Sequence, residues 1–245
     1  MKETAPGSMD RAPSLLSANW TRAEDRFLFE GAPGVVVWTT ARSFSMPAGE
    51  QPEPGKFRAY VEATGPRPRS VAGMGQVHGA RIEEVRTGQD RVVSSCDGLV
   101  TGSPGVALVV RTADCLPIAA IGPGGRRLGV AHAGWRGIRA GIPRRLVERM
   151  GGPDLEIAIG PGIGPCCYEV GPEFEDGFPD YLVRRKGRRF LDLIGAARAQ
   201  LAEAGVPPER IHAAGWCTAC SPEFCHSFRR DGAASGRMLT VAMLL

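Results

Sequence analysis

Three segments of this sequence, at 76–79, 112–115 and 131–137, each carry one side chain that can bind a metal ion. These side chains are His78, Cys115 and His132. Two imidazoles and one thiol suit zinc, and three protein ligands leave one position of a tetrahedral ion open to water or substrate. An open position is typical of a catalytic metal, so the trio is a candidate catalytic zinc site.

The three residues are too far apart in sequence to share one turn of a helix, so three different elements must bring them together. Cys115 and His132 both adjoin predicted buried strands, and strand ends hold side chains rigidly beside a surface cleft. The alternative is that the histidines are hydrogen-bonded core residues and that the cysteine packs as a small apolar side chain. Spacing alone leaves both interpretations open.

A second group of cysteines lies nearer the C-terminus, where Cys217 and Cys220 form a Cys-x-x-Cys pair ahead of Cys225 and His226. Such a pair is the usual half of a structural zinc site, which Cys225 and His226 could complete. Adjacent residues rarely bind one ion, however, so reduced, partly buried thiols are the favoured interpretation. The two cysteines at 166–167 cannot easily bridge to each other and are expected to be structural or to line the cleft.

Composition and charge exclude several classes of protein. The chain has 245 residues and a formal net charge of +4. No apolar run approaches the ~20 residues of a membrane-spanning helix, and the mild charge gives little support for nucleic-acid binding. Seven cysteines is an odd number in a chain without a recognisable signal peptide, which favours reduced thiols. We expect a cytoplasmic protein with no membrane or nucleic-acid partner.

Hydrophobic patterning predicts buried strands and two helices within one domain. Residues 1–30 lack periodicity and are expected to form a loose leader of the kind that is often disordered. The arginine-rich residues 184–189 are interpreted as a solvated loop. Because short strands are mixed irregularly with helices, the expected class is α+β. The predicted strands are 35–40, 106–110, 116–121, 128–132, 155–159 and 238–245, and the predicted helices are 138–150 and 191–204.

A series of motifs, in this order, resembles the purine nucleoside phosphorylase or laccase-domain family, the YfiH-like group whose members are also named polyphenol oxidases. The similarity covers most of the chain from about residue 71 to residue 245, and the ADC and AHAGWRG motifs are its most specific part. The motifs are QVHG at 76–79, DGLVT at 97–101, TADCLP at 112–117, AHAGWRG at 131–137, IGPGIG at 159–164, CCYEVG at 166–171, SFRRDG at 227–232 and GRM at 236–238.

The resemblance implies a zinc site and a fold. In this family the histidine of QVHG, the cysteine of ADC and the histidine of AHAGW bind zinc, and they correspond to His78, Cys115 and His132 here. Copper is a metal that could occupy the site in vitro. The implied fold is α+β, with stacked mixed β-sheets flanked by helices in an α/β/β/α-like sandwich. A single zinc-dependent domain over residues 31–245, usually monomeric, would form it.

The resemblance also implies an activity, the phosphorolysis of adenosine, inosine and methylthioadenosine to free base and ribose or methylthioribose 1-phosphate, together with adenosine deamination. The expected partners are therefore a purine nucleoside and phosphate. The chain departs from the family near its start, where residues 40–44 retain only a fragment of a Thr-Arg-x-Gly-Gly stretch and the connection to Gln76 is short. Cys225 and His226 also stand where an aromatic pair is common. These departures put the substrate specificity in question.

Deamination needs an activated water and a group that moves its proton. Zinc lowers the pKa of a bound water to ~7, and known nucleobase deaminases use a His/Cys ligand set. Asp97 and Asp114 are the candidate proton shuttles, with Asp97 preferred because an aspartate before glycine often sits in an accessible turn. The alternative for both is that they cap turns.

Phosphorolysis needs a bound phosphate and stabilisation of the leaving purine. Planar guanidinium groups suit phosphate. Arg136, which follows the His132 turn, is the candidate catalytic arginine, and Arg229 and Arg230 are candidate substrate-binding residues. Gln76 is a further candidate for substrate binding.

Three other functions compete with this interpretation. One is a cysteine hydrolase, a deamidase or a peptidase active on cell-wall amino-sugar peptides, with Cys115 as nucleophile and His132 as base. A second is a copper polyphenol oxidase, although a multi-copper cluster needs on the order of ten imidazoles and the chain has four histidines. The third is a metal or nucleotide binder without catalytic activity.

Overall fold

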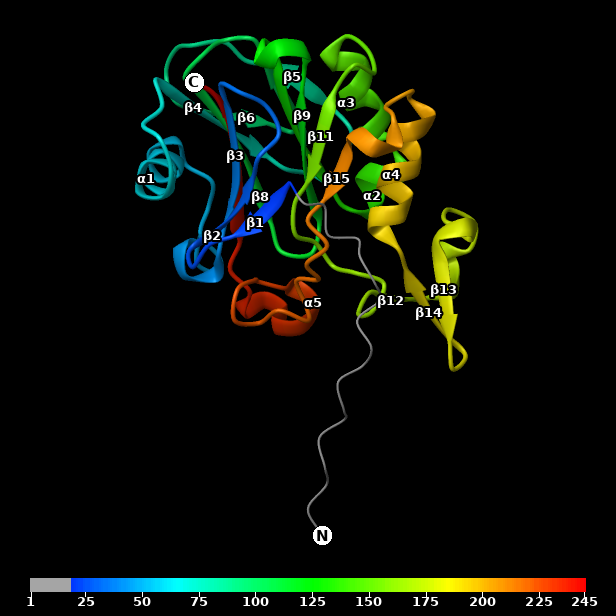
Figure 1. The fold of residues 1–245 in the computed structure, drawn as a ribbon. Coiled ribbons are helices and arrows are strands. Elements are labelled where there is room, and N and C mark those ends of the chain that lie inside the picture. The colour runs from blue at the N-terminus through cyan, green and yellow to red at the C-terminus, as the bar shows by residue number, and fades with distance from the viewer. Residues whose placement is uncertain (1–18) are drawn as a thin grey trace.

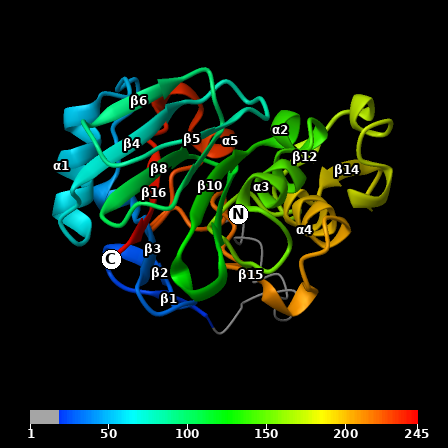
Figure 2. The same ribbon diagram turned by 90° about the horizontal axis from the view of Figure 1, so that it is seen from above.

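Two stacked β-sheets with helices on both outer faces make up the architecture of this computed structural model, which describes residues 19–245 (Figures 1 and 2). Seen from above, α1 lies against the outer face of one sheet, and α2, α3 and α4 lie against the outer face of the other (Figure 2). The predicted α+β fold, an α/β/β/α-like sandwich in a single domain, is confirmed. The helices are α1 (Pro54–Thr64), α2 (Trp135–Arg139), α3 (Ile142–Met150), α4 (Leu193–Glu203) and α5 (Phe228–Asp231).

Both large sheets are mixed. Most neighbouring strands are antiparallel, but β4 pairs in parallel with β6 and β8, β11 with β15, and β5 with β7. The seven-stranded sheet has the order β1 (Trp20–Arg22), β2 (Arg26–Phe29), β3 (Val35–Thr40), β16 (Met238–Leu244), β8 (Val106–Thr112), β4 (Ser70–Gly75) and β6 (Arg91–Ser94). The six-stranded sheet has the order β15 (Ile211–Ala213), β11 (Glu156–Ile159), β9 (Leu116–Ile121), β10 (Leu128–Ala133), β7 (Gly98–Thr101) and β5 (Ile82–Glu84).

A small third sheet and several 3-10 turns complete the described chain. The sheet has the order β12 (Glu169–Val170), β14 (Arg188–Leu191) and β13 (Leu182–Arg185). Within residues 19–245, no helix has the length and apolar character needed to cross a membrane. The 3-10 turns are η1 (Arg42–Phe44), η2 (Pro123–Gly125), η3 (Pro172–Phe174), η4 (Pro179–Tyr181), η5 (Pro208–Arg210) and η6 (Gly232–Ala234).

The central strands are apolar on both faces because each sheet is covered on both sides. Side chains alternate along a strand, so neighbouring residues of β9 enter different parts of the core. Ile118 packs with the helices α3 and α4, whereas Ala119 packs in the layer between the two sheets. On β8, Leu108 lies in the layer between the sheets and Val109 packs towards α1. This double burial explains the uninterrupted apolar runs that predicted these strands.

The helix predicted over 138–150 is two helices. Gly141 separates α2 from α3 and has a φ of +81°, a left-handed conformation that glycine adopts without steric cost. The preceding helix α2 begins directly after Gly134, close to His132. The second predicted helix, over 191–204, corresponds to α4, whose N-cap residue Asp192 accepts a hydrogen bond from the backbone N–H of Gly195.

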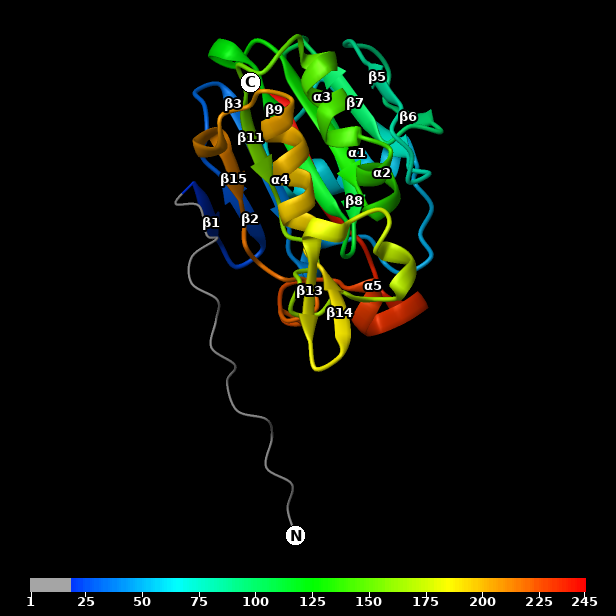
Figure 3. The same ribbon diagram turned by 90° about the vertical axis from the view of Figure 1, so that its right-hand side faces the viewer.

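Two predictions about chain organisation need correction. The leader was expected over residues 1–30, but β1 and β2 already belong to the seven-stranded sheet, and only residues 1–18 lie outside the described part of the chain. Residues 184–189 do not form a loop. They belong to the hairpin of β13 and β14, which extends beyond the end of α4 (Figure 3). Its arginines are mostly exposed and pair with Glu169 and Glu175, so the sequence shows the charge of the hairpin but not its strand pairing.

We expect Leu108→Ala to destabilise the fold by about 3 kcal/mol, because it removes a fully buried side chain from the layer between the sheets. The matched control is Leu245→Ala, where the side chain is 63% exposed and the loss should stay below about 0.5 kcal/mol. Urea denaturation followed by circular dichroism measures both. Equal losses at the two positions would contradict this description of the core.

Candidate functional site

The structure brings together the three predicted metal ligands. His78 lies in the loop after β4, Cys115 lies in the turn between β8 and β9, and His132 lies on β10. One ligand atom from each residue, a ring nitrogen or the sulfur, can be chosen so that all three lie within 4.8 Å of one another. The two imidazole rings meet nearly edge to face, with their centroids 4.8 Å apart. Two nitrogens and one sulfur at this separation fit a tetrahedral zinc ion with an open position.

The backbone around the three residues is shaped for close approach. His78 and Asp114 both have positive φ, +62° and +92°, which is uncommon for residues other than glycine and marks locally constrained backbone. At Gly134, an added Cβ would lie 2.8 Å from the sulfur of Cys115 and 3.2 Å from Cδ2 of His78. Only glycine therefore leaves room for the two side chains to converge.

Asp97 holds the loop that carries His78. Its carboxylate is fully buried and accepts hydrogen bonds from the backbone N–H groups of Val77, His78 and Gly79, at 3.2, 2.9 and 2.7 Å. The same carboxylate lies 2.9 Å from Nδ1 of His132. That contact occupies Nδ1 and leaves Nε2 of His132 as the nitrogen available to a metal. One buried charge thus positions two of the three candidate ligands.

The charges in this cluster reinforce one another. Burial opposes ionisation of Cys115, but the adjacent His132 and hydrogen bonds from both imidazoles hold the pKa of its thiol below the ordinary value. Burial would likewise lower the pKa of His132, yet the thiolate of Cys115 and the carboxylate of Asp97 raise it. Burial also opposes ionisation of Asp97, but its hydrogen bonds to His132 and to Gly79 lower its pKa. The arrangement favours a deprotonated sulfur, the form that binds metals and attacks electrophiles.

The cluster forms part of the wall of a cavity of about 480 Å³, within the usual range for small-molecule sites. Arg111, Arg229 and Arg237 line the same cavity. Nε of Arg111 is buried and has no hydrogen-bond partner in the described part of the chain. The pKa of Arg111 is lowered mainly by burial and also by the positive charge of Arg237. A cavity lined by three arginines, one of them with this unpaired Nε, is suited to an anionic ligand.

Aromatic side chains line another part of the cavity. Trp135 and Tyr168 are half-buried there, and Phe228 is 53% exposed although it is large and apolar. Burial raises the pKa of Tyr168 to about 12, so its hydroxyl stays protonated and can donate a hydrogen bond at neutral pH. Flat apolar surfaces with a polar tip suit an aromatic ring such as a purine.

Of the other predicted site residues, three line the cavity. Gln76 uses its side-chain amide to pair with the backbone N–H and C=O of Arg111, at 2.9 and 2.8 Å. The carboxylate of Asp114 accepts hydrogen bonds from the hydroxyl of Thr218 and the backbone N–H of Arg229, both at 2.6 Å. The guanidinium of Arg229 donates to the carbonyl of Glu169 at 2.6 Å.

Two predicted phosphate-binding arginines do not line the cavity. Arg136 is exposed, and its guanidinium lies over the ring of Trp135 instead. Arg230 donates its hydrogen bonds to Asp231 and to backbone carbonyl groups, so its role is to hold the loops around α5 together. Sequence spacing from a metal ligand was therefore a poor guide to which guanidinium groups face the site.

Sequence reasoning missed Arg111, Arg237, Tyr168 and Phe228. A signal for Arg111 was present, because a charged residue that directly follows the buried run 106–110 and precedes Cys115 by four positions needs a reason to be there. Arg237 and Tyr168 each lie within a motif quoted for the family resemblance, GRM and CCYEVG, but neither was considered for ligand binding. The short region near residues 40–44 lies outside the cavity lining, and Arg42 there pairs with Asp231 at 3.6 Å.

Comparison with known proteins gives consistent results. Residues 55–245 match the family model described as multi-copper polyphenol oxidoreductase laccase. The purine nucleoside phosphorylase YlmD of Geobacillus stearothermophilus is 39% identical over 188 residues, which cover 67% of this chain and 68% of that protein. Adenosine deaminase RL5, from an unknown prokaryotic organism, is 36% identical over 166 residues, covering 62% of this chain and 63% of that protein. The crystal structure of Bacillus licheniformis hypothetical protein YfiH superposes with a TM-score of 0.83 at 25% identity, covering 94% of this chain and 100% of that one.

We expect Asp97→Asn to destabilise the chelator-treated protein by about 3 kcal/mol, because the new amide group would point N–H donors at a backbone that already presents N–H donors. The matched control is Asp192→Asn, since asparagine caps a helix as well as aspartate and the change should cost less than about 0.5 kcal/mol. Urea denaturation measures both. A loss at Asp97 no larger than at Asp192 would show that the four contacts carry little of the stability of the loop.

Proposed function

The chain belongs to the multi-copper polyphenol oxidoreductase laccase family, and we propose that it is a zinc-dependent purine nucleoside enzyme. The proposed reactions are phosphorolysis of adenosine, inosine and methylthioadenosine, and deamination of adenosine. The names of its relatives, purine nucleoside phosphorylase and adenosine deaminase, support this class of reaction. The observation that carries the proposal is that one cavity is lined both by the His78, Cys115 and His132 cluster and by three arginines.

The donor set favours zinc over a multi-copper cluster. His78 and His132 are the two histidines that line the cavity, and the other two histidines of the chain are engaged elsewhere. His212 pairs with Glu156 and His226 pairs with Ser45. A multi-copper centre uses on the order of ten imidazoles, and this cavity is lined by two. Zinc held by His78, Cys115 and His132 would supply Lewis acidity, which would activate water and stabilise negative charge.

Asp97 and Asp114 have different proposed roles. The buried carboxylate of Asp97 makes its hydrogen bonds to the loop of His78 and to His132, so we assign Asp97 a positioning role and not proton transfer. Asp114 lines the cavity and adjoins Cys115, and its carboxylate accepts two hydrogen bonds from residues within 19–245. It is therefore the carboxylate proposed to move the proton during deamination.

The arginines are proposed to hold the phosphate that attacks the nucleoside. Arg111 is the strongest candidate because its Nε has no hydrogen-bond partner among residues 19–245 and because two hydrogen bonds between its backbone and Gln76 fix its position. Arg237 lies close enough to Arg111 for its charge to lower the pKa of that side chain, and a phosphate between them would relieve the repulsion. Tyr168 and Phe228 are proposed to contact the purine base.

A second candidate function is a cysteine hydrolase, and one observation favours it. Cys115, His132 and Asp97 form a chain of contacts in the order that a nucleophile, its base and an orienting carboxylate require. A cysteine hydrolase needs one thiol and one base, so His78 would have no role in this series of contacts. The two functions therefore differ in their dependence on His78.

We expect His78→Ala to lose one equivalent of zinc and to reduce the rates of both phosphorolysis and deamination by at least about 100-fold. This loss exceeds that usually caused by replacing a residue that hydrogen-bonds to a metal ligand. Elemental analysis of the purified protein and chromatographic detection of hypoxanthine, adenine and inosine measure these changes. His212→Ala, which removes an imidazole outside the cavity, is the control and should change neither quantity. Full turnover by His78→Ala, abolished by iodoacetamide and insensitive to chelators, would support the cysteine hydrolase instead.

We expect Arg111→Met to raise the KM for phosphate about tenfold or more, because it removes charge-assisted hydrogen bonds to that substrate. The rate of adenosine deamination, which needs no phosphate, should change little. The control is Arg136→Met, which alters an exposed arginine outside the cavity and should leave the KM for phosphate within about twofold. An unchanged KM in Arg111→Met would remove Arg111 from the phosphate site.

A further inference from the structure

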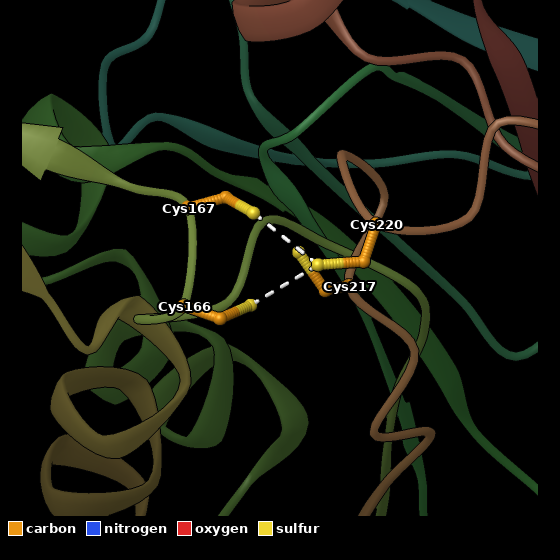
Figure 4. A group of neighbouring side chains, drawn as sticks. All are labelled: Cys166, Cys167, Cys217 and Cys220. Carbon is orange, nitrogen blue, oxygen red and sulfur yellow. Dashed lines mark hydrogen bonds between the residues drawn. The ribbon is translucent and has the colours of Figure 1, made fainter. Parts of the chain in front are cut away.

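Four cysteines that are distant in sequence gather outside the cavity cluster. Cys166 and Cys167 lie in the turn between β11 and β12, and Cys217 and Cys220 lie in the segment that follows β15. Figure 4 shows all four side chains pointing towards a common centre. Their sulfur atoms all lie within 4.8 Å of one another. Among residues 19–245, this group and the His78 cluster are the two places where three or more such donors gather.

The distances between the sulfurs suit one shared ion. The sulfur of Cys220 lies 3.5 Å from that of Cys166 and 3.2 Å from that of Cys167. Zinc–sulfur bonds of about 2.3 Å in a tetrahedron place neighbouring sulfurs ~3.8 Å apart. Thiolates that ligate an iron–sulfur cluster bind different iron atoms and must spread around a larger object. A single small cation fits the observed spacing best.

The backbone is folded so that adjacent cysteines share one side. In extended chain, neighbouring side chains point in opposite directions, which is why adjacent residues rarely bind one ion. Here the N–H groups of Cys167 and Tyr168 both donate to the carbonyl of Gly164 at 3.0 Å, which closes a tight turn. The turn directs the thiols of Cys166 and Cys167 towards the same partner, Cys220 (Figure 4).

The two segments are also joined by their backbones. Gly162 forms a bridge with Cys217, through an N–H from Gly162 to the carbonyl of Trp216 and an N–H from Thr218 to the carbonyl of Gly162. The N–H of Gly164 donates to the sulfur of Cys217 at 3.2 Å. Backbone N–H groups directed at sulfur are typical of ligating thiolates.

We propose that Cys166, Cys167, Cys217 and Cys220 bind one structural zinc ion, separate from the ion proposed in the cavity. Four thiolates complete a tetrahedral coordination sphere and leave no open position for substrate, which is the mark of a structural site. Zinc with four thiolates carries a net charge of −2. Arg185 donates to the carbonyls of Pro165 and Cys166, at 2.5 and 3.3 Å, and Arg230 donates to those of Thr218 and Ala219, at 2.9 and 3.3 Å. Both positive groups thus lie next to the cysteine segments.

The proposed ion joins two segments that build the cavity. Tyr168 follows the first pair of cysteines directly and lines the cavity. Thr218 lies between the second pair, and its hydroxyl donates to Asp114 in the cavity wall. Zinc in this position would hold Tyr168 and Asp114 at a fixed separation without touching the substrate. Loss of the ion should therefore loosen the cavity wall and weaken nucleoside binding.

The test is zinc stoichiometry of the full chain, purified under reducing conditions without chelator, in the wild type and in Cys217→Ser/Cys220→Ser. We expect the double variant to hold one zinc equivalent fewer than the wild type, whatever the content of the His78 cluster. Cys225→Ala is the matched control, because this buried cysteine lies in the same segment but outside the group, and it should retain the full wild-type content. Cobalt loaded into His78→Ala should show the intense visible absorption of a tetrahedral tetrathiolate site, and the double variant should not.

Wild-type protein provides a readout that does not depend on the folding of any variant. We expect Cys166 and Cys220, which are exposed, to react slowly with a thiol reagent until a strong chelator is added, and rapidly afterwards. Rapid reaction before chelation would overturn the proposal. So would an intact mass lower by two hydrogens per disulfide in the protein as purified, or iron in place of zinc. If His78→Ala retains all its zinc while the double variant loses one equivalent, the structural site stands and the cavity site fails.

Discussion

The buried carboxylate of Asp97 connects the parts of this molecule on which its chemistry depends. It belongs to the turn before β7, yet it orders the loop of His78, after a strand of the other sheet, and contacts the imidazole of His132 on β10. The N–H of His132 also donates to the carbonyl of Asp97 at 2.7 Å. A charge buried at this depth is stable only when its hydrogen bonds are complete, so the loop and the imidazole have little freedom. The loop of His78 and the imidazole of His132 are thereby fixed at the point where the three candidate metal ligands meet.

The cavity forms because the ends of two different sheets meet there. Arg111 lies near the end of β8, and Arg237 lies just before β16; both strands belong to the seven-stranded sheet. His132 belongs to the six-stranded sheet. The turn at Tyr168 and the helix α5 close the remaining side. Arg111 and His132 lie on strands, whereas Trp135 and Phe228 come from the helices α2 and α5, and Tyr168 comes from the turn after β11. This division is the usual way in which a stable scaffold carries a reactive site.

Local hydrophobic patterns predicted the buried strands, whereas features that depend on contacts between distant segments were missed. The runs at 106–110 and 116–121 are apolar throughout because both faces of each strand are buried, and both runs form strands as predicted. The break at Gly141 was missed because a helical pattern continues across it. Residues 184–189 were assigned to a loop because a run of charged residues lacks the apolar pattern that predicts strands, although β13 pairs with β14 here. The gathering of Cys166 with Cys220 depends on a tight turn and a bridge between distant segments, which no local pattern reveals.

The site followed the same rule. The family motifs pointed to the three residues of the candidate metal cluster, but the hydrogen bonds that distinguish Asp97 from Asp114 exist only in the folded chain. The central claim, that His78, Cys115 and His132 share one ion, is tested most directly by anomalous X-ray diffraction at the zinc absorption edge. For crystals of protein purified without chelator, the account predicts an anomalous peak within bonding distance of both imidazoles and the sulfur of Cys115. Well-ordered density for the three side chains with no anomalous peak between them would contradict it.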